Sequence, residues 1–182
     1  TNYISLMPTN IYGINDNFDL DSSHVLPALL RKIHLGKCLQ KNHWNLIIKD
    51  IKSRPLKYIP DLSSKQKILD GLSKYGIFNN KISIWGTGEP LREFLWSDDL
   101  ADACIYSLKN IDFKDLYEKK EINIRNTHIN IGSGKEISIK DLAFLIKNIV
   151  KNDDDFIFNK SKPNGTLRKL TDVSKINKLG WK

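Results

Sequence analysis

The sequence has little sulfur and no long apolar run. Its only cysteines, Cys38 and Cys104, lie far apart, and no group of Cys and His has metal-ligand spacing. We therefore expect two reduced thiols and no metal site, rather than a disulfide or a zinc centre. No window approaches the roughly 18 apolar residues of a membrane span. The first residues do not form a charged-then-apolar leader, so we expect a cytoplasmic protein without a signal peptide or membrane segment.

Acidic residues are scarce in one segment. The chain of 182 residues has a net charge of +8, and residues 37–81 alone, with ten Lys or Arg and three Asp or Glu, contribute +7. Two interpretations are open: a solvated, Lys-rich insertion, or a module that binds nucleic acid or another polyanion. Aromatic residues do not alternate with the basic ones, which favours the insertion, and no nucleic acid is expected as a partner.

The remaining patterning alternates short apolar runs with helical periodicity, which predicts an α/β fold. Expected strands are Tyr3–Met7, Ile82–Trp85, Phe94–Trp96, one near 128–132 and one in "DDDFIFN". Five helices are expected: 24–37 capped by Ser22 or Ser23, 63–76 capped by Ser63 or Ser64, one capped by Ser97 or Asp98, one after Ser138, and a short one in "TDVSKINKLGW". The apolar face of the third helix would consist of Leu100, Ala103, Cys104 and Leu108. The apolar face of the fourth would consist of Leu142, Leu145, Ile146, Ile149 and Val150. Ser138 followed by Asp141 forms a capping-box pattern.

Four segments occur in a fixed order: "LMPTNIYGINDNFDLDSSHVLPALLRK", "ISIWGTGEPLREFLWSDDLADACI", "HINIGSGKEISIKDLA" and "SKPNGTLRKLTDVSKINKLGW". Together they resemble the second half of the GDP-L-fucose synthase family (GDP-4-keto-6-deoxymannose epimerase/reductase), a branch of the extended short-chain dehydrogenases/reductases. They cover most of the chain outside 37–81.

The resemblance implies a fold and a division of the chain. The chain would hold the last part of a Rossmann-type NADP-binding sheet and a smaller C-terminal substrate-binding α/β subdomain. Residues 1–36 would supply the last Rossmann strand, the cofactor loop and a substrate-binding helix. Residues 37–81 would be the basic insertion, and 82–182 the substrate-binding subdomain with a returning Rossmann strand near 128–132.

The cofactor-binding half of that family is missing from the sequence. Neither a G-x-x-G-x-x-G turn nor a Tyr-x-x-x-Lys pair is present, and "GSGKE" at 132–136 matches no phosphate-loop pattern. We therefore expect the chain to be part of a longer protein, with that half upstream of Thr1, and the 182 residues alone to be inactive.

The resemblance also implies an activity. The complete protein would be an NADP(H)-dependent epimerase/reductase of a GDP-4-keto-6-deoxy sugar, a homodimer that serves surface polysaccharide synthesis. Some relatives act on GDP-linked 6-deoxy-4-keto-heptoses, and some only reduce carbon 4 without epimerisation. The basic insertion and Asn164 make such a reductase the alternative within the same fold.

Two sets of site residues follow from the resemblance near the N-terminus. Pro8, Thr9, Asn10, Ile11 and His24 would contact NADP(H). His24 would also act as an acid during epimerisation, because imidazole titrates near neutrality. The alternative for His24 is a helix-start residue with local hydrogen bonds.

Substrate contacts are implied for Lys32, Trp85, Arg92 and Asn164. The cations suit a diphosphate, the indole offers a flat surface for a base or sugar, and the amide can hydrogen-bond. Arg31 is a second candidate for the role of Lys32. The alternatives are a solvated lysine, a packed strand-end Trp85, an Arg92 ion pair with Glu93 or Asp98, and an Asn164 that only forms the turn before Gly165.

Overall fold

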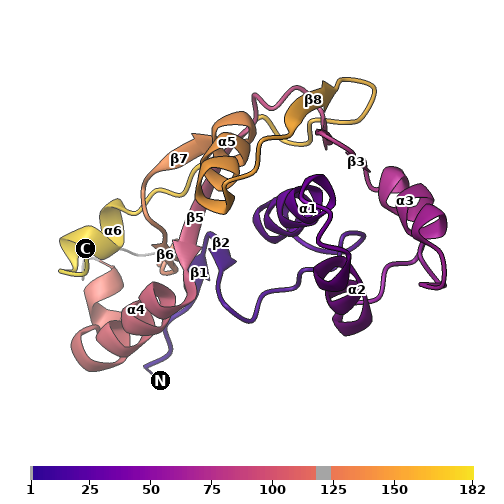
Figure 1. The fold of residues 1–182 in the computed structure, drawn as a ribbon. Helices are drawn as coiled ribbons and strands as arrows, with labels where there is room; N and C mark the ends of the chain where they lie inside the picture. The colour runs from indigo at the N-terminus through magenta and orange to yellow at the C-terminus, as the bar shows by residue number, and fades with distance from the viewer. Residues whose placement is uncertain (1, 118–123) are drawn as a thin grey trace. The chain divides into compact units, whose positions relative to one another are not determined.

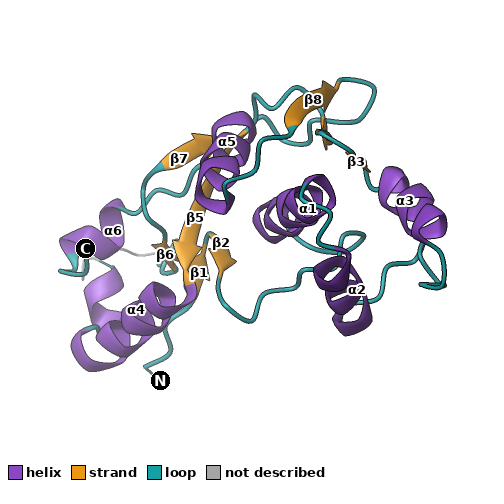
Figure 2. Ribbon diagram, in the orientation of Figure 1, coloured by secondary structure: helices purple, strands orange, loops and turns teal. Residues whose placement is uncertain are grey.

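The computed structural model describes residues 2–117 and 124–182. The chain forms two compact units (Figure 1). The first unit comprises Thr1–Ile14, Leu91–Ile137 and Arg168–Lys182, and the second comprises Asn15–Pro90 and Ser138–Leu167. Helices and strands alternate along the chain, which confirms the predicted α/β class (Figure 2).

The first unit is built on parallel strand pairs. Strand β1 pairs with β6, β2 pairs with β5, and β5 also pairs with β9, all in parallel. The unit's elements are β1 (Leu6–Pro8), β2 (Asn10–Tyr12), β5 (Leu91–Trp96), α4 (Ser97–Asn110), a 3₁₀ turn (Phe113–Leu116), β6 (Ile129–Ile131), β7 (Glu136–Ser138, whose last residue belongs to the second unit), β9 (Arg168–Lys169) and α6 (Ser174–Lys178). Parallel neighbours that lie far apart in sequence are typical of α/β folds.

The core of the first unit gathers distant parts of the chain. Leu95, Ala103, Ile129, Ile131 and Ile176 are buried together. They come from β5, α4, β6 and α6. This core therefore depends on long-range placement rather than on any one segment.

The second unit contains the longer helices. Its elements are α1 (Val25–Gln40), α2 (Trp44–Ser53), α3 (Lys65–Lys74), β3 (Ile77–Phe78), β4 (Lys81–Trp85), α5 (Ile139–Val150) and β8 (Asp155–Asn159). Strand β4 pairs in parallel with β8 and antiparallel with β3. Ser138 caps α5 through a 2.9 Å hydrogen bond from the Asp141 backbone N–H, which confirms the predicted cap.

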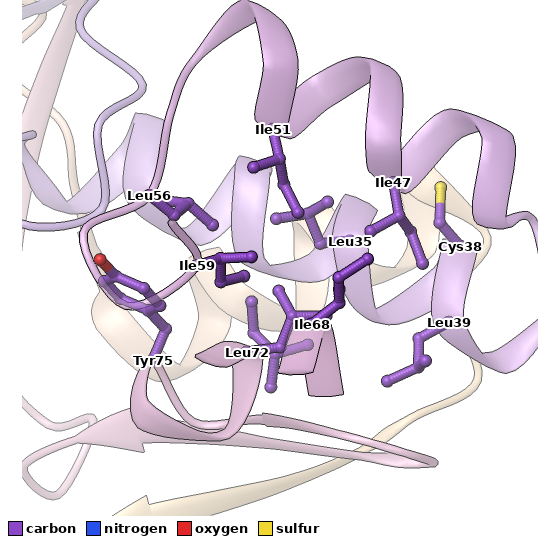
Figure 3. Close-up of a cluster of buried hydrophobic side chains, with 11 residues drawn as sticks. Leu35, Cys38, Leu39, Ile47, Ile51, Leu56, Ile59, Ile68, Leu72 and Tyr75 are labelled. Atoms are coloured by element: carbon purple, nitrogen blue, oxygen red, sulfur yellow. The ribbon is translucent and has the colours of Figure 1, made fainter. Parts of the chain in front are cut away.

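The basic segment 37–81 contributes most of one hydrophobic core. Figure 3 shows aliphatic side chains from α1, α2 and α3 pointing toward one another. We call this set the apolar cluster; its buried members are Leu35, Cys38, Leu39, Ile47, Ile51, Leu56, Ile59, Ile68, Leu72, Tyr75 and Ile77. The segment is therefore a folded part of the second unit, and its helix α2 was not predicted.

Several local predictions were wrong. The first strand begins at Leu6 instead of Tyr3, which is exposed. Helix α1 begins after His24 without a side-chain cap, so neither Ser22 nor Ser23 caps it. Leu108 in α4 and Ile149 in α5 point to solvent, at 86% and 71% exposure, although both were expected on apolar faces. Helical spacing marks a face but does not say how wide the buried stripe is.

No described helix is long and apolar enough to cross a membrane.

Candidate functional site

The predicted cofactor loop lies in the first unit, but most of it is strand: Pro8 ends β1, Asn10 and Ile11 belong to β2, and Thr9 lies between the two strands. The Thr9 backbone N–H donates to the Ile131 carbonyl at 2.9 Å, and the Asn10 side-chain amide donates to the Glu93 carbonyl at 2.8 Å. The Asn10 donor is thus used to fix the loop. Its backbone and the exposed Ile11 side chain are left as surfaces for a ligand.

Glu93, which was not among the predicted site residues, accepts hydrogen bonds from two distant parts of the chain near this loop. Its side chain is fully buried. One carboxylate oxygen accepts the Gly134 backbone N–H at 2.7 Å, and the other accepts the Thr171 N–H at 2.9 Å. A side chain at Gly132 would collide with this carboxylate. We call these interactions the Glu93 contacts. The available signal was an acid directly before the predicted strand Phe94–Trp96.

Arg92 precedes Glu93 in β5 and is half-buried. Its guanidinium donates to the Leu91 carbonyl at 2.7 Å. Among the described residues it forms no ion pair with Glu93 or Asp98, so that alternative is wrong. The remaining guanidinium donors are available to an anionic ligand.

In the second unit, His24 occupies the N-cap position of α1. Its backbone is extended (φ −68°, ψ 164°), its side chain makes no capping hydrogen bond, and the residue is exposed. The imidazole therefore does not cap the helix. A role for His24 in proton transfer stays a prediction.

Lys32 and Arg31 are not solvated, so the alternative of a solvated lysine at position 32 is wrong. The Lys32 ammonium donates to the Ser83 carbonyl of β4 at 2.5 Å, and burial lowers the pKa of Lys32 to about 8. Arg31 is buried and donates twice to the Asp50 carboxylate, at 3.0 and 2.8 Å, and also to the Phe18 and Arg54 carbonyls. Arg31 is thus fully engaged in structure, which leaves Lys32 as the candidate ligand contact on this helix.

Trp85 ends β4, and its side chain is 62% exposed, so the alternative of a packed indole is wrong. The Lys162 ammonium lies over the ring, 5.3 Å from its centroid. An exposed indole with a cation beside it suits an aromatic ligand that carries negative charge.

Asn164 lies against the turn that follows Trp85. Its Oδ1 accepts the Thr87 backbone N–H at 2.7 Å and is 3.2 Å from the Thr87 hydroxyl. A side chain at Gly86 would collide with Asn164, and Gly86 has a positive φ of 77°. Trp85 and Asn164 are thus brought together in the second unit by the 159–165 loop. The turn role and a ligand role are compatible, because the Asn164 amide nitrogen has no partner among the described residues.

A cleft of about 520 Å³ in the first unit is not lined by any of the predicted ligand residues. It is lined by Leu95, Asp99, Asp102, Gly132, Ser133, Val173, Asn177, Trp181 and Lys182. The Trp181 indole N–H donates to Asp102 at 2.8 Å within it. Within residues 2–117 and 124–182, no group of three His, Cys, Asp or Glu could hold a metal ion.

Comparison with known families gives one match. The model described as the NAD dependent epimerase/dehydratase family covers residues 1–64 and 66–132. This is more than half of the chain and includes the Pro8–Ile11 loop, His24, Lys32, Trp85 and Arg92.

Individual proteins add detail. The chain is 39% identical over 179 residues to probable GDP-L-fucose synthase 1 from Oryza sativa subsp. japonica, with 98% of this chain and 39% of the relative covered. A GDP-6-OMe-4-keto-L-xylo-heptose reductase from C. jejuni is 45% identical with a TM-score of 0.88, over 100% of this chain and 49% of that one. A GDP-mannoheptose C4 reductase from Campylobacter jejuni, solved with NADP bound, is 44% identical with a TM-score of 0.82, over 100% and 48%. The chain thus spans about two fifths to one half of these proteins, and the structural likeness includes residues 37–81.

Proposed function

Because the chain belongs to the NAD dependent epimerase/dehydratase family, we propose that its protein is an NADP(H)-dependent reductase of a GDP-linked 4-keto-6-deoxy sugar. The ketone at carbon 4 would be reduced to an alcohol, with the hydride supplied by bound NADPH and a proton reaching the ketone oxygen. The observation that carries the proposal is the similarity, over the whole chain, to two C. jejuni GDP-heptose reductases.

The higher identity to the two heptose reductases, 45% and 44% against 39% for the GDP-L-fucose synthase relative, favours a heptose over a hexose as the sugar. Residues 37–81 do not separate the two sugars, because the alignment to that relative also covers 98% of this chain. They build the apolar cluster on which α1 packs, and α1 carries Lys32 and begins directly after His24. Synthesis of a GDP-6-deoxyhexose with epimerisation, as the GDP-L-fucose synthase relatives suggest, is the second candidate.

Individual roles follow from the chemistry of each side chain. Arg92 and Lys32 would bind phosphate oxygens, and contact with phosphate would raise the depressed pKa of Lys32. Trp85 would stack on the base, and Asn164 would hydrogen-bond to the ligand beside it. His24 would supply a proton if the protein epimerises its substrate.

The Pro8–Ile11 loop and His24 would contact the cofactor. Thr9 follows the parallel strand β1, and the carboxyl end of a parallel strand is where such ligands bind in these sheets, which supports a contact with the nicotinamide end. The cofactor supplies the hydride when bound. This chain would orient the ring and exclude water.

The direct test is NADPH oxidation by the complete protein with GDP-6-deoxy-4-keto-heptose and GDP-4-keto-6-deoxymannose. Faster turnover of the heptose supports the proposal, and no oxidation with either sugar would refute it. His24→Asn separates the two candidates. A reductase keeps most of its activity on an already epimerised ketone, whereas an epimerase/reductase loses formation of the epimerised product.

The remaining expectations belong to this proposal. We propose that the enzyme works in the cytoplasm as a homodimer and supplies a sugar for surface polysaccharide. The competing hypothesis is a non-catalytic module that binds a polyanion through residues 37–81. Several cations of this segment are already engaged with aromatic rings or acids: Arg54 over Phe18, Lys57 over Tyr58, Lys65 over Trp44, and Lys67 with Asp61.

A further inference from the structure

The loop between β2 and α1 is braced from within by one aspartate. The Asp19 carboxylate accepts the Asp21 and Ser22 backbone N–H groups at 3.1 and 2.9 Å and the Ser22 hydroxyl at 2.8 Å. The Asp19 carbonyl accepts the Ser23 N–H at 2.9 Å. These hydrogen bonds form one turn, which leads directly to His24 at the start of α1.

His24 is placed by its backbone and not by its side chain. The residue is exposed, and its imidazole makes no capping hydrogen bond. The position of the ring is therefore set from two sides: by α1, where the Ala28 N–H donates to the His24 carbonyl at 3.1 Å, and by the turn that precedes it. A movement of that turn would move the imidazole.

A tyrosine of the segment 37–81 holds the same turn from outside. The Tyr75 hydroxyl donates to the Asp21 carboxylate at 2.9 Å. The Tyr75 ring is buried in the apolar cluster, and Figure 3 shows its hydroxyl pointing away from the aliphatic side chains. Burial and Asp21 raise the pKa of Tyr75 to about 12, so the hydroxyl is a donor at neutral pH. Hydrogen bonds to a charged acceptor are among the stronger ones in proteins.

Two further contacts join the loop to the same segment. Leu20 packs against the apolar cluster, and the Arg54 guanidinium lies 5.2 Å from the centre of the Phe18 ring. Leu20 and Phe18 both precede Asp21 in the chain. Among the described residues, the bond from Tyr75 is thus the last hydrogen bond that the segment makes to the loop before α1 begins.

We propose that Tyr75 is a positioning residue: through its hydrogen bond to Asp21 it holds the His24 imidazole in place for contact with NADP(H). The basic segment thus acts on the site through one hydroxyl, in addition to building a core. The inference rests on the proposed function, because the cofactor contact of His24 belongs to it. The identity of the sugar does not enter.

The experiment measures the dissociation constant of NADPH for the complete purified protein by fluorescence titration, without a sugar. Tyr75→Phe removes the hydroxyl and keeps the ring in the apolar cluster. We expect it to weaken NADPH binding about fivefold, the share of one hydrogen bond. In a His24→Ala background the same change should have no further effect, because the hydroxyl acts through that imidazole. A further loss in the double variant overturns the inference, and so does a His24→Ala protein that binds NADPH like the parent.

Tyr58→Phe is the matched control. The Tyr58 ring lies beside that of Tyr75, with the centroids 5.2 Å apart, so this variant removes a neighbouring hydroxyl and leaves the bond to Asp21 in place. It should bind NADPH like the parent. Hydrogen exchange at the Ser22 and Ser23 amides, which donate within the turn, should become about fivefold faster in Tyr75→Phe and stay unchanged in Tyr58→Phe. Unchanged exchange in both variants contradicts the inference.

Substitutions of Asp21 test the other end of the bond. Asp21→Asn keeps an oxygen that can accept the Tyr75 hydroxyl, and it should bind NADPH within about twofold of the parent. Asp21→Ala removes the acceptor and should match Tyr75→Phe. Equal losses for Asn and Ala would count against a hydrogen bond as the cause.

Reduction of the sugars by the same protein separates this inference from the proposed function. A protein that shows the expected NADPH pattern but oxidises NADPH with neither sugar supports the role of Tyr75 and refutes the proposed reaction. A protein that binds no NADPH overturns both.

Discussion

Different interactions stabilise the apolar cluster of the second unit and the Glu93 contacts of the first unit. The apolar cluster draws its buried members from residues 35–77, nearly all of them aliphatic. The Glu93 contacts join a central strand to backbone N–H groups 41 and 78 residues further along the chain. One region thus depends on area removed from water, and the other on hydrogen bonds to one buried carboxylate.

The difference predicts how each region tolerates change. A cluster of many aliphatic side chains spreads its stability over many contacts, so that losing one side chain costs only that side chain's share. A buried carboxylate that accepts two backbone N–H groups concentrates stability in one residue. Four substitutions, each with a matched control variant, test this comparison.

The largest effect is expected for Glu93→Ala. It removes a buried carboxylate that accepts two backbone N–H groups, and hydrogen bonds to a charged group are worth about 1.5–3 kcal/mol each, so we expect a loss of about 4 kcal/mol in the free energy of unfolding. Urea denaturation measures this loss. Hydrogen exchange should show lost protection at both amides.

Glu93→Gln is the matched control, because it keeps one acceptor oxygen and the side-chain shape. Its expected loss is about half as large, about 2 kcal/mol. If alanine and glutamine cost the same, or less than about 1 kcal/mol, the carboxylate does not stabilise the first unit in the way proposed.

Ile47→Ala tests the apolar cluster. Ile47 is fully buried on α2, and truncation should cost about 3 kcal/mol through lost transfer energy and a residual cavity. Leu46→Ala, on the same helix but 40% exposed, should cost less than about 1 kcal/mol. Similar losses for the two variants in urea denaturation would mean that α2 does not pack as described.

Lys32→Met tests how much stability is lost by burying a charge beside the aliphatic side chains of α1. The folded pKa of Lys32 is about 8, against about 10.4 in an unfolded chain. The folded state therefore binds fewer protons between these values, and stability should rise as pH increases from about 8 to 10. Below pH 8 the cost of burying the charge is present in full.

The methionine variant removes both that cost and the hydrogen bond to Ser83. We expect it to be about 2 kcal/mol more stable than the parent at pH 7. Its stability should not show the increase between pH 8 and 10 that deprotonation of Lys32 gives the parent. Lys49→Met, at an exposed position, controls for the change in net charge. A Lys32→Met protein that is less stable than the parent at pH 7 would show that the lysine is not penalised by burial.

Measurements stop near pH 10, because burial and Asp21 raise the pKa of Tyr75 to about 12, and stability falls as pH rises from 10 toward that value.

The sequence was sufficient for the features that depend on local patterning. The α/β class, helix α3 and the cap at Ser138 all follow from periodicity and short-range hydrogen bonding. Helix α2 was missed because "NHWNLIIKDIKS" reads as part of a basic, polar segment, although Ile47 and Ile51 are four residues apart on one face. Its existence depends on the tertiary packing in the apolar cluster.

The candidate site was harder to predict because its residues work through distant partners. Motif matching selected Lys32, Trp85 and Asn164, but not the Ser83 carbonyl, the exposure of the indole or the Thr87 N–H that fixes the amide. The Glu93 contacts likewise need Gly134 and Thr171 to be placed beside β5. None of these contacts lies within one helical turn or one strand pair, so a single sequence contains no local signal for them.

The smallest expected effect compares two serines that occupy the same position in two helices of the second unit. Ser138 accepts the Asp141 N–H at 2.9 Å, whereas Ser64 precedes α3 without a side-chain cap. Ser138→Ala should therefore cost about 1 kcal/mol, and Ser64→Ala only a few tenths. The difference in urea midpoint between the two variants measures the cap together with the 2.6 Å hydrogen bond that the Ser138 hydroxyl donates to the Asp141 carboxylate, because both variants lose the same hydroxyl. Equal losses would mean that Ser64 forms its cap in solution, and the local pattern would then have been a better guide than the packed structure.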